Sequence, residues 1–143
     1  MNQPGILFLC VANSARSQMA EALGRARFGD IVPVFSAGSE PSRVHPLAVQ
    51  AMAKRRLDLS AQTSKSVDTI DPAQVKVVVT LCAEEYCPAF LHDALRLHWP
   101  MPDPAHREPG EGEAEQLARF LEVGDQIAVR LSELDPILRP RLQ

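Results

Sequence analysis

Cys10 and Arg16 are separated by five residues, and a thiol and a guanidinium at this spacing can do chemistry on a tetrahedral oxyanion. The segment between them follows the apolar run over 6–9 and leads into a helical pattern. A short loop between a strand and a helix turns its backbone N–H groups inward, and the helix adds the positive end of its dipole. The oxyanion-binding residues that this arrangement predicts are Val11, Ala12, Asn13, Ser14, Ala15 and Arg16.

Cys10 is the expected nucleophile, because the positive field that holds an anion also favours a thiolate. Arg16 supplies a planar fork of donors for the oxyanion. The hydroxyl of Ser17 can donate a further hydrogen bond to the sulfur of Cys10. A buried cysteine that ends an interior strand, followed by a solvated arginine, gives the same spacing by chance. The preceding strand, the following helix and Ser17 favour the catalytic interpretation.

Four strands and three helices are needed to position these side chains. The apolar pattern predicts strands at 6–10, 31–35, 75–81 and 95–99, and helices at 14–28, 46–56 and 111–134. Pro33 places the second strand at a sheet edge, and the β-branched third strand is central. Strands that alternate with helices predict an α/β fold, a three-layer α/β/α domain with a four-stranded parallel sheet. Cys10, Cys82 and Asp103 then share the rim at the carboxyl ends of the strands.

The composition of the chain restricts its class. At 143 residues with a net charge of -3, it fits a single domain over 1–143 and gives no sign of a nucleic-acid partner. No stretch has the length of a membrane span, and the N-terminal residues lack the pattern of a signal peptide, so we expect a monomer in the cytoplasm. The four histidines are scattered, which predicts surface or capping positions for each, no zinc site and no tightly bound cofactor.

Asp103 is the candidate general acid. A leaving oxygen needs a proton from the side opposite the nucleophile, and a carboxylic acid is the usual donor. Pro102 and Pro104 hold Asp103 in place with little conformational entropy to lose. An aspartate in a proline-rich turn is also a common structural feature, so its predicted place on the rim is what singles it out.

Cys82 and Cys87 distinguish two reactions that would share the same anion site. A phosphatase needs one thiolate, after which water hydrolyses the thiophosphate. A reductase needs a second thiol that attacks the first sulfur and leaves two electrons on the bound centre, which arsenic(V) accepts and phosphorus(V) does not. A third thiol can then move the disulfide to the surface by exchange. Small core residues are the alternative for both cysteines, but their place just beyond a strand end favours the relay.

The chain resembles the thioredoxin-coupled arsenate reductases, which are built on the low-molecular-weight tyrosine phosphatase fold. The matching segments run over nearly the whole chain and are 10–21 (CVANSARSQMAE), 35–38 (FSAG), 44–48 (VHPLA), 62–66 (QTSKS), 79–82 (VTLC) and 98–105 (HWPMPDPA). The resemblance implies arsenate as substrate and thioredoxin as the final reductant. The roles that it implies are Cys10 as nucleophile, Arg16 in the oxyanion site, Ser17 as thiolate stabiliser, Asp103 as acid, and Cys82 and Cys87 as second and third thiols.

Three departures from the family pattern have consequences. Ala15 stands where relatives often have cysteine, so no disulfide can form inside the loop. Only four residues separate Cys82 from Cys87, fewer than in familiar members, which leaves glutaredoxin or another thiol open as reductant. Lys65 stands where some members have an acid beside a potassium ion, and we hypothesise that its ammonium replaces the ion. The residues that match the rest of that ion site are Asn13, Glu21, Ser36 and Thr63.

Two other functions remain compatible with the motifs. The first is a small phosphatase that acts on phosphotyrosine or a small phosphoester, although this chain has Asp103-Pro104-Ala105 where the phosphatases have Asp-Pro-Tyr. The second is an oxyanion-binding or redox-sensing module without turnover. An intact general acid argues against the second, because a binding module does not need one.

Overall fold

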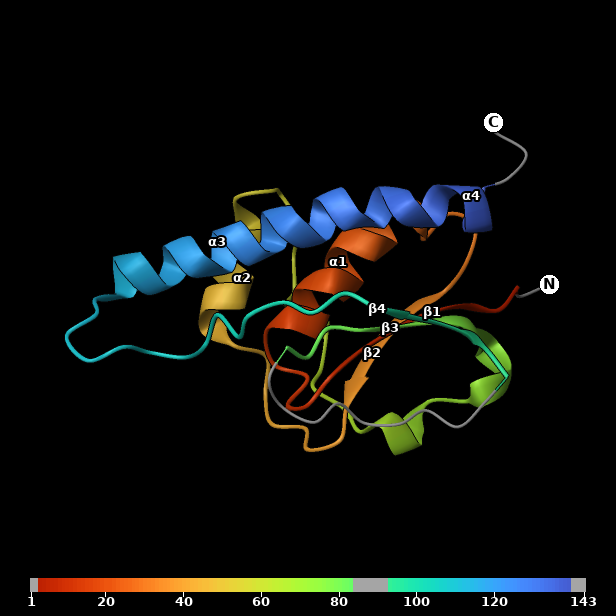
Figure 1. The fold of residues 1–143 in the computed structure, drawn as a ribbon, viewed down its shortest axis with the longest axis horizontal. Helices are drawn as coiled ribbons and strands as arrows, with labels where there is room; N and C mark the ends of the chain where they lie inside the picture. Colours follow the sequence, from red (N-terminus) through yellow and green to blue (C-terminus); the bar gives the residue numbers. More distant parts are fainter. Residues whose placement is uncertain (1–2, 84–92, 140–143) are drawn as a thin grey trace.

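A four-stranded parallel sheet forms the centre of the molecule, of which the computed structural model describes residues 3–83 and 93–139 (Figure 1). The strands are β1 (Gly5–Cys10), β2 (Val34–Gly38), β3 (Val75–Thr80) and β4 (Leu95–His98), in the spatial order β2-β1-β3-β4. All neighbours are parallel, which confirms the predicted α/β class. Cys10 pairs with Gly38 and Thr80 with His98, so the carboxyl ends of the strands meet at one rim.

The strands differ in burial according to their place in the sheet. Every residue of the central strand β1 is buried, as its continuous apolar sequence predicts. The edge strand β2 begins at Val34, whereas the sequence predicts a start at residue 31. The strand starts later because Pro33 lacks an N–H group. The carbonyl of Pro33 still accepts a hydrogen bond from Ile6 N at 3.1 Å. The predicted edge position of this strand is therefore correct, while its predicted bounds are shifted.

The helices are shorter than the periodicity predicts. The α-helices are α1 (Arg16–Phe28), α2 (Pro46–Ala53), α3 (Glu113–Arg130) and α4 (Asp135–Leu138), and the 3₁₀ helices are η1 (Val67–Thr69), η2 (Pro72–Gln74) and η3 (Leu131–Leu134). The helix predicted at 111–134 changes to 3₁₀ at Leu131, because the ring of Pro136 cannot continue an α-helix. Helix α2 stops at Ala53, where the chain turns through Arg56 at φ 63° and Leu57 N donates to Met52 O.

The two faces of the sheet are covered differently. Helices α1, α2 and α3 lie over one face (Figure 1), where Phe8, Val79 and Phe120 belong to the larger core. The 3₁₀ helix η1 and the residue after it cover the other face, where Val67 and Ile70 pack in a second cluster with Leu9. α-Helices thus cover one face and η1 covers part of the other, while the edge strand β4 is largely exposed.

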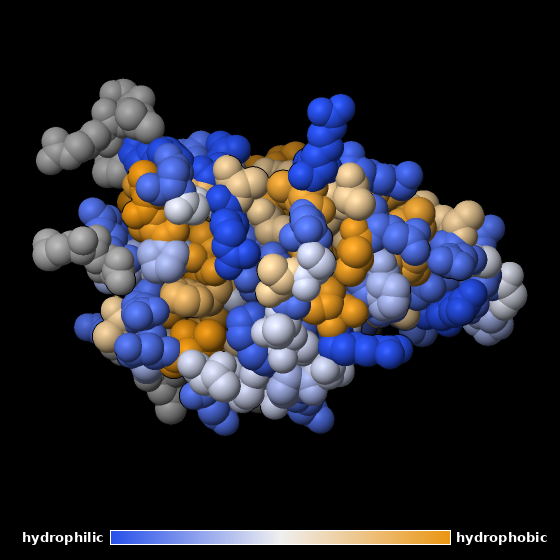
Figure 2. All heavy atoms as spheres, turned by 180° about the vertical axis from the view of Figure 1, so that it is seen from behind, coloured by the Kyte–Doolittle hydropathy of each residue, from blue (hydrophilic) through white to orange (hydrophobic). Residues whose placement is uncertain are grey.

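The surface mixes apolar and charged side chains. Orange apolar groups on the face shown in Figure 2 are interrupted by blue charged residues. The large apolar side chains that are exposed among the described residues are Val49, Leu95 and Val129. In the same part of the chain, no helix has the length and apolar character needed to cross a membrane.

Phe120 and Val129 test how the core and the surface of α3 contribute to stability. Phe120 is fully buried, so Phe120→Ala should lower the free energy of unfolding by about 3–5 kcal/mol. Val129 is 72% exposed on the same helix, and Val129→Ala should change it by less than about 0.5 kcal/mol. Urea unfolding followed by circular dichroism measures both. Equal effects of the two substitutions would contradict the assignment of α3 to the core.

Candidate active site

The loop over residues 11–15 turns its carbonyl groups away from its own centre. Four of these carbonyls accept hydrogen bonds from surrounding elements. The bonds are Glu40 N to Val11 O (2.9 Å), Ser42 N and Ser64 Oγ to Ala12 O (3.2 and 3.0 Å), Gln18 Nε2 to Asn13 O (3.1 Å) and His45 N to Ser14 O (2.9 Å). Since the carbonyl and the N–H of one peptide unit point in opposite directions, outward carbonyls leave the N–H groups facing inward.

The N–H groups of this loop complete the anion-binding geometry. Within the described part of the chain, none of the backbone N–H groups of residues 11–15 donates to a protein acceptor. Helix α1 begins directly after the loop, with Ala15 as N-cap and no capping side chain. Free N–H groups beside the positive end of a helix bind a tetrahedral oxyanion. The structure therefore builds the cradle that the C-x5-R spacing predicts.

Gly38 at the end of β2 lets the loop take this shape. A Cβ atom built on Gly38 would lie 2.2 Å from Val11 O and 2.9 Å from Asn13 N, both of them backbone atoms. Asn13 itself has φ 48°, in the left-handed region that asparagine tolerates better than most residues. The close approach of the loop to β2 therefore requires glycine at position 38.

Cys10 lies at the base of the cradle. Its side chain is buried, and its Sγ lies 2.8 Å from Ser17 Oγ. Ser17 Oγ also accepts a hydrogen bond from Asn13 Nδ2 at 2.7 Å. The pairing of Ser17 with the sulfur of Cys10 is the geometry that thiolate stabilisation requires.

Arg16 connects the cradle to the loops after β3 and β4. The guanidinium is buried and donates through Nη1 to Met101 O at 3.1 Å and to Leu81 O at 3.5 Å. These two carbonyls stand just beyond the carboxyl ends of the two strands. Arg16 therefore lies on the predicted rim.

Cys82 stands on the same rim as Cys10. Leu81 N donates to Leu9 O at 2.9 Å, and each cysteine is the next residue of its segment. Cys82 is buried and disulfide-bonded, whereas Cys10 is free. Cys87 lies outside the described residues. The sheet thus brings the first and second predicted thiols to neighbouring strand ends.

Asp103 is exposed in the loop after β4, where its Oδ1 accepts a hydrogen bond from Ala105 N at 3.0 Å. It interacts electrostatically with His45, whose own main-chain N–H holds Ser14 O of the cradle. Burial lowers the pKa of His45, and the charge of Asp103 partly offsets that shift. His45 is the N-cap of α2, with Nδ1 accepting from Leu47 N, so the capping position expected for it is correct.

The side chain of Lys65 lies in a polar cluster beside the cradle. Its ammonium is 3.3 Å from Glu21 Oε1 and donates to Thr63 O at 2.9 Å. Ser36 Oγ donates to the same Glu21 oxygen at 2.5 Å. The backbone N–H of Lys65, and not the ammonium, donates to Asn13 Oδ1 at 2.8 Å. The cluster brings together every residue assigned to the ion site, and the Lys65 ammonium contacts the carboxylate of Glu21.

The sequence interpretation missed one buried polar residue of this region. Gln18 has no exposed surface and contacts Asn13 and Thr63, but nothing in its residue type or spacing distinguished it from other glutamines on helices. Among the described residues, no group of three or more His, Cys, Asp or Glu side chains is placed to hold a metal ion.

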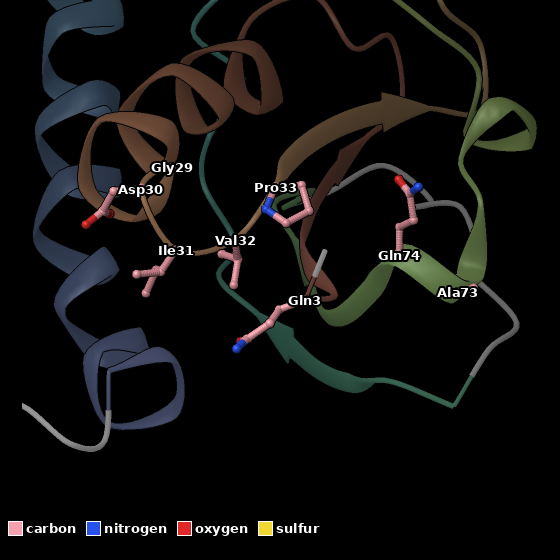
Figure 3. A pocket seen from close by; sticks show the side chains of 8 residues that line it. All are labelled: Gln3, Gly29, Asp30, Ile31, Val32, Pro33, Ala73 and Gln74. Atoms are coloured by element: carbon pink, nitrogen blue, oxygen red, sulfur yellow. The ribbon is translucent and has the colours of Figure 1, made fainter. Parts of the chain in front are cut away.

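A cavity of about 330 Å³ lies away from this rim (Figure 3). It is lined by Gln3 before β1, residues 29–33 before β2 and Gln74 before β3, which places it at the amino ends of the strands. Asp30, the acidic residue among its lining, forms an ion pair with Arg139 at 2.5 Å. The described residues that line this cavity include no cysteine or serine, so the carboxyl rim remains the candidate active site.

The family of the chain follows from comparison with known proteins. The sequence profile of the family described as low molecular weight phosphotyrosine protein phosphatase matches residues 5–139. The chain belongs to this family and has an α/β fold with a four-stranded parallel sheet.

Similar curated proteins include several that are named arsenate reductase. A protein of Halalkalibacterium halodurans named arsenate reductase is 44% identical over 133 residues, covering 92% of this chain and 94% of the relative. An arsenate reductase of Bacillus cereus strain AH187 is 41% identical over 132 residues, covering 87% and 98%.

Solved structures that resemble this chain include proteins named arsenate reductase. An arsenate reductase in the phosphate-binding state matches with a TM-score of 0.76 at 29% identity, covering 95% of this chain and 99% of that one. A thioredoxin-dependent arsenate reductase of Corynebacterium glutamicum matches with a TM-score of 0.71 at 27% identity, covering 98% of this chain and 64% of that one.

Gly38→Ala tests the packing that shapes the cradle. The added methyl group would overlap Val11 O, which is backbone and cannot rotate away, so the loop must move. We expect loss of inorganic phosphate binding and destabilisation by about 1–3 kcal/mol. Isothermal titration with phosphate and urea unfolding measure the two effects. Gly112→Ala is the control, because its new Cβ would meet the flexible end of Glu115; unchanged phosphate binding by Gly38→Ala would contradict the proposed role of the contact.

Proposed function

We propose that this chain is an arsenate reductase that reduces arsenate to arsenite with a cysteine nucleophile and a disulfide relay. The observation that carries this proposal is the hydrogen bond from Leu81 N to Leu9 O at 2.9 Å, which brings the segment before Cys10 beside the segment before Cys82. A phosphatase would need only the first of these thiols. The names of the relatives at 44% and 41% identity support the same activity.

The first step forms a bond between sulfur and arsenic. The N–H groups of residues 11–15 and the Arg16 guanidinium bind the arsenate oxygens, while Ser17 stabilises the Cys10 thiolate. The thiolate attacks arsenic(V), and Asp103 protonates the oxygen that leaves as water. The product is a thioester of arsenate on Cys10.

The second step moves two electrons. The thiolate of Cys82 attacks the Cys10 sulfur, and the electron pair of the sulfur–arsenic bond stays on arsenic, which leaves as arsenite. Cys87 then attacks Cys82, releases the Cys10 thiol and takes over the disulfide.

The reductant and the cellular setting are the finer parts of the proposal. Thioredoxin reduces the final disulfide, which the name of the Corynebacterium glutamicum neighbour supports. We place the protein in the cytoplasm, where reduced thioredoxin is regenerated, as a monomer without a tightly bound cofactor.

The family also favours a phosphatase as the alternative function. Cys10, Arg16 and Asp103 suffice for attack on a phosphate monoester, so weak hydrolysis of p-nitrophenyl phosphate is expected from the same cradle. Such hydrolysis needs neither Cys82 nor Cys87, and this difference separates the two functions.

Arsenate-dependent NADPH oxidation, coupled through thioredoxin and thioredoxin reductase, tests the relay. The wild type should turn over continuously, while Cys82→Ser should give at most one turnover, because the thiol proposed to attack the Cys10 sulfur is missing. Cys87→Ser should also stop after the first disulfide. Both variants should keep p-nitrophenyl phosphate hydrolysis, which shows that the cradle is intact. Turnover by both variants at the wild-type rate would sink the relay.

We also propose that the Lys65 ammonium takes the place of a potassium ion next to Glu21. Its contacts with Glu21 and Thr63 O put a positive charge where the ion would lie, so catalysis should not depend on potassium. Equal rates in sodium and potassium buffers of the same ionic strength are the expected result. Lys65→Gln should reduce the rate because Glu21 loses a cation, with Lys54→Gln as a control on an exposed lysine. Clear activation of the wild type by potassium would contradict the proposal.

A further inference from the structure

A continuous chain of hydrogen bonds leads from the surface of α1 to the sulfur of Cys10. It contains two glutamines that the reaction described above does not use. In order, its members are Arg25, Gln62, Gln18, Asn13, Ser17 and Cys10. Each contact determines which end of the next side chain donates and which accepts.

Gln18 is fully buried, and the two hydrogens of its amide nitrogen are shared among three oxygens. Its Nε2 lies 3.1 Å from Asn13 O, 3.0 Å from Asn13 Oδ1 and 2.9 Å from Thr63 O. All three oxygens are acceptors, so only the amide nitrogen of Gln18 fits at this position. Gln18 thereby holds both the side chain and the carbonyl of Asn13, the loop residue with φ 48°.

The orientation of Gln18 is fixed from its other side. Gln62 Nε2 donates to Gln18 Oε1 at 2.8 Å and to Gln18 O at 3.1 Å. Arg25, which can only donate, bonds Gln62 Oε1 at 3.3 Å, so the Gln62 nitrogen must face Gln18. This series of hydrogen bonds therefore begins at Arg25, whose side chain is 49% exposed.

The orientation of the Asn13 amide determines whether Ser17 donates or accepts the hydrogen bond between them. Its Oδ1 accepts from Gln18 Nε2 and from Lys65 N, so both hydrogens of Nδ2 point to Ser17 Oγ and Ser36 Oγ. Ser17 Oγ then has an acceptor position filled by Asn13, and its single hydrogen is available to the Cys10 sulfur 2.8 Å away. With the Asn13 amide reversed, Ser17 would have to donate to Asn13 instead.

We infer that Gln18 is a positioning residue for the nucleophile, which orients Asn13 so that the Ser17 hydroxyl donates to the Cys10 thiolate. This inference rests on Cys10 as the nucleophile of the proposed function. Gln18 is not needed to hold the cradle as a whole, because Glu40, Ser42 and His45 bind the other loop carbonyls independently. Its loss should therefore lower the reactivity of Cys10 and leave anion binding in place.

The test uses a Cys82→Ser/Cys87→Ser background, in which Cys10 is the one remaining thiol. Gln18→Met keeps the length of the side chain and removes its donors. The rate of Cys10 alkylation by iodoacetamide at neutral pH should fall about tenfold, the size expected for one lost hydrogen bond to a charged group. The ultraviolet absorbance of the thiolate should fall with it, while the Kd for inorganic phosphate should stay unchanged. Gln126→Met, on the exposed side of α3, is the control and should alter none of these.

A double-mutant cycle with Ser17→Ala shows whether Gln18 acts through Ser17. If it does, Ser17→Ala/Gln18→Met reacts no more slowly than Ser17→Ala alone. Three results would each overturn the inference. They are alkylation of the Gln18→Met variant at the wild-type rate, rate losses that multiply in the double variant, and a parallel loss of phosphate binding. Alkylation and phosphate binding involve no arsenate, so these results stand apart from the outcome of the reductase assay.

Discussion

The outward bonding of the carbonyl groups in the loop after β1 is the constraint on which the rest of the structure depends. A peptide unit whose carbonyl is bonded on the outer side of the loop presents its N–H on the inner side, toward an anion. The segment after β2, the start of α2 and the third residue of α1 supply those partners, through Glu40, Ser42, His45 and Gln18. The hydrogen bonds to the carbonyl groups of this short loop thus constrain where these elements lie around the rim.

The parallel sheet adds the second requirement, which is a thiol next to the first. Because β1 and β3 are adjacent and parallel, the residues that follow them leave the sheet at the same rim. Leu81 N donates to Leu9 O, and Cys82 and Cys10 are the next residues along the two segments, so backbone hydrogen bonding brings both cysteines to this rim. In the proposed reaction, the loop after β1 binds the anion and Cys82, two residues beyond the end of β3, takes part in electron transfer. The same fold can therefore serve a phosphatase or a reductase, according to the residue at position 82.

The features that the sequence predicts are those that depend on local order. The strand, loop and helix around Cys10, the edge position of β2 and the rim shared by Cys10 and Cys82 follow from short patterns and from the rules of parallel sheets. The end of α3 at Arg130 was missed because apolar spacing continues through a segment where Pro136 breaks the hydrogen bonds. Gln18 was missed for another reason. Its partners Gln62 and Thr63 lie more than 40 residues away, and only the folded chain shows which amide end faces which.

Glu21 completes the polar cluster and further restricts which of its groups donate hydrogen bonds and which accept them. A carboxylate buried to this degree is stable only with partners, and Arg25 at 2.6 Å and Lys65 at 3.3 Å supply two cations. As a carboxylate it can only accept, so Ser36 must donate to it and must accept from Asn13. Arg25 thus acts on Asn13 twice, through Glu21 and Ser36 and through Gln62 and Gln18. Both routes require the same amide orientation, which leaves the hydrogen of Ser17 for the sulfur of Cys10.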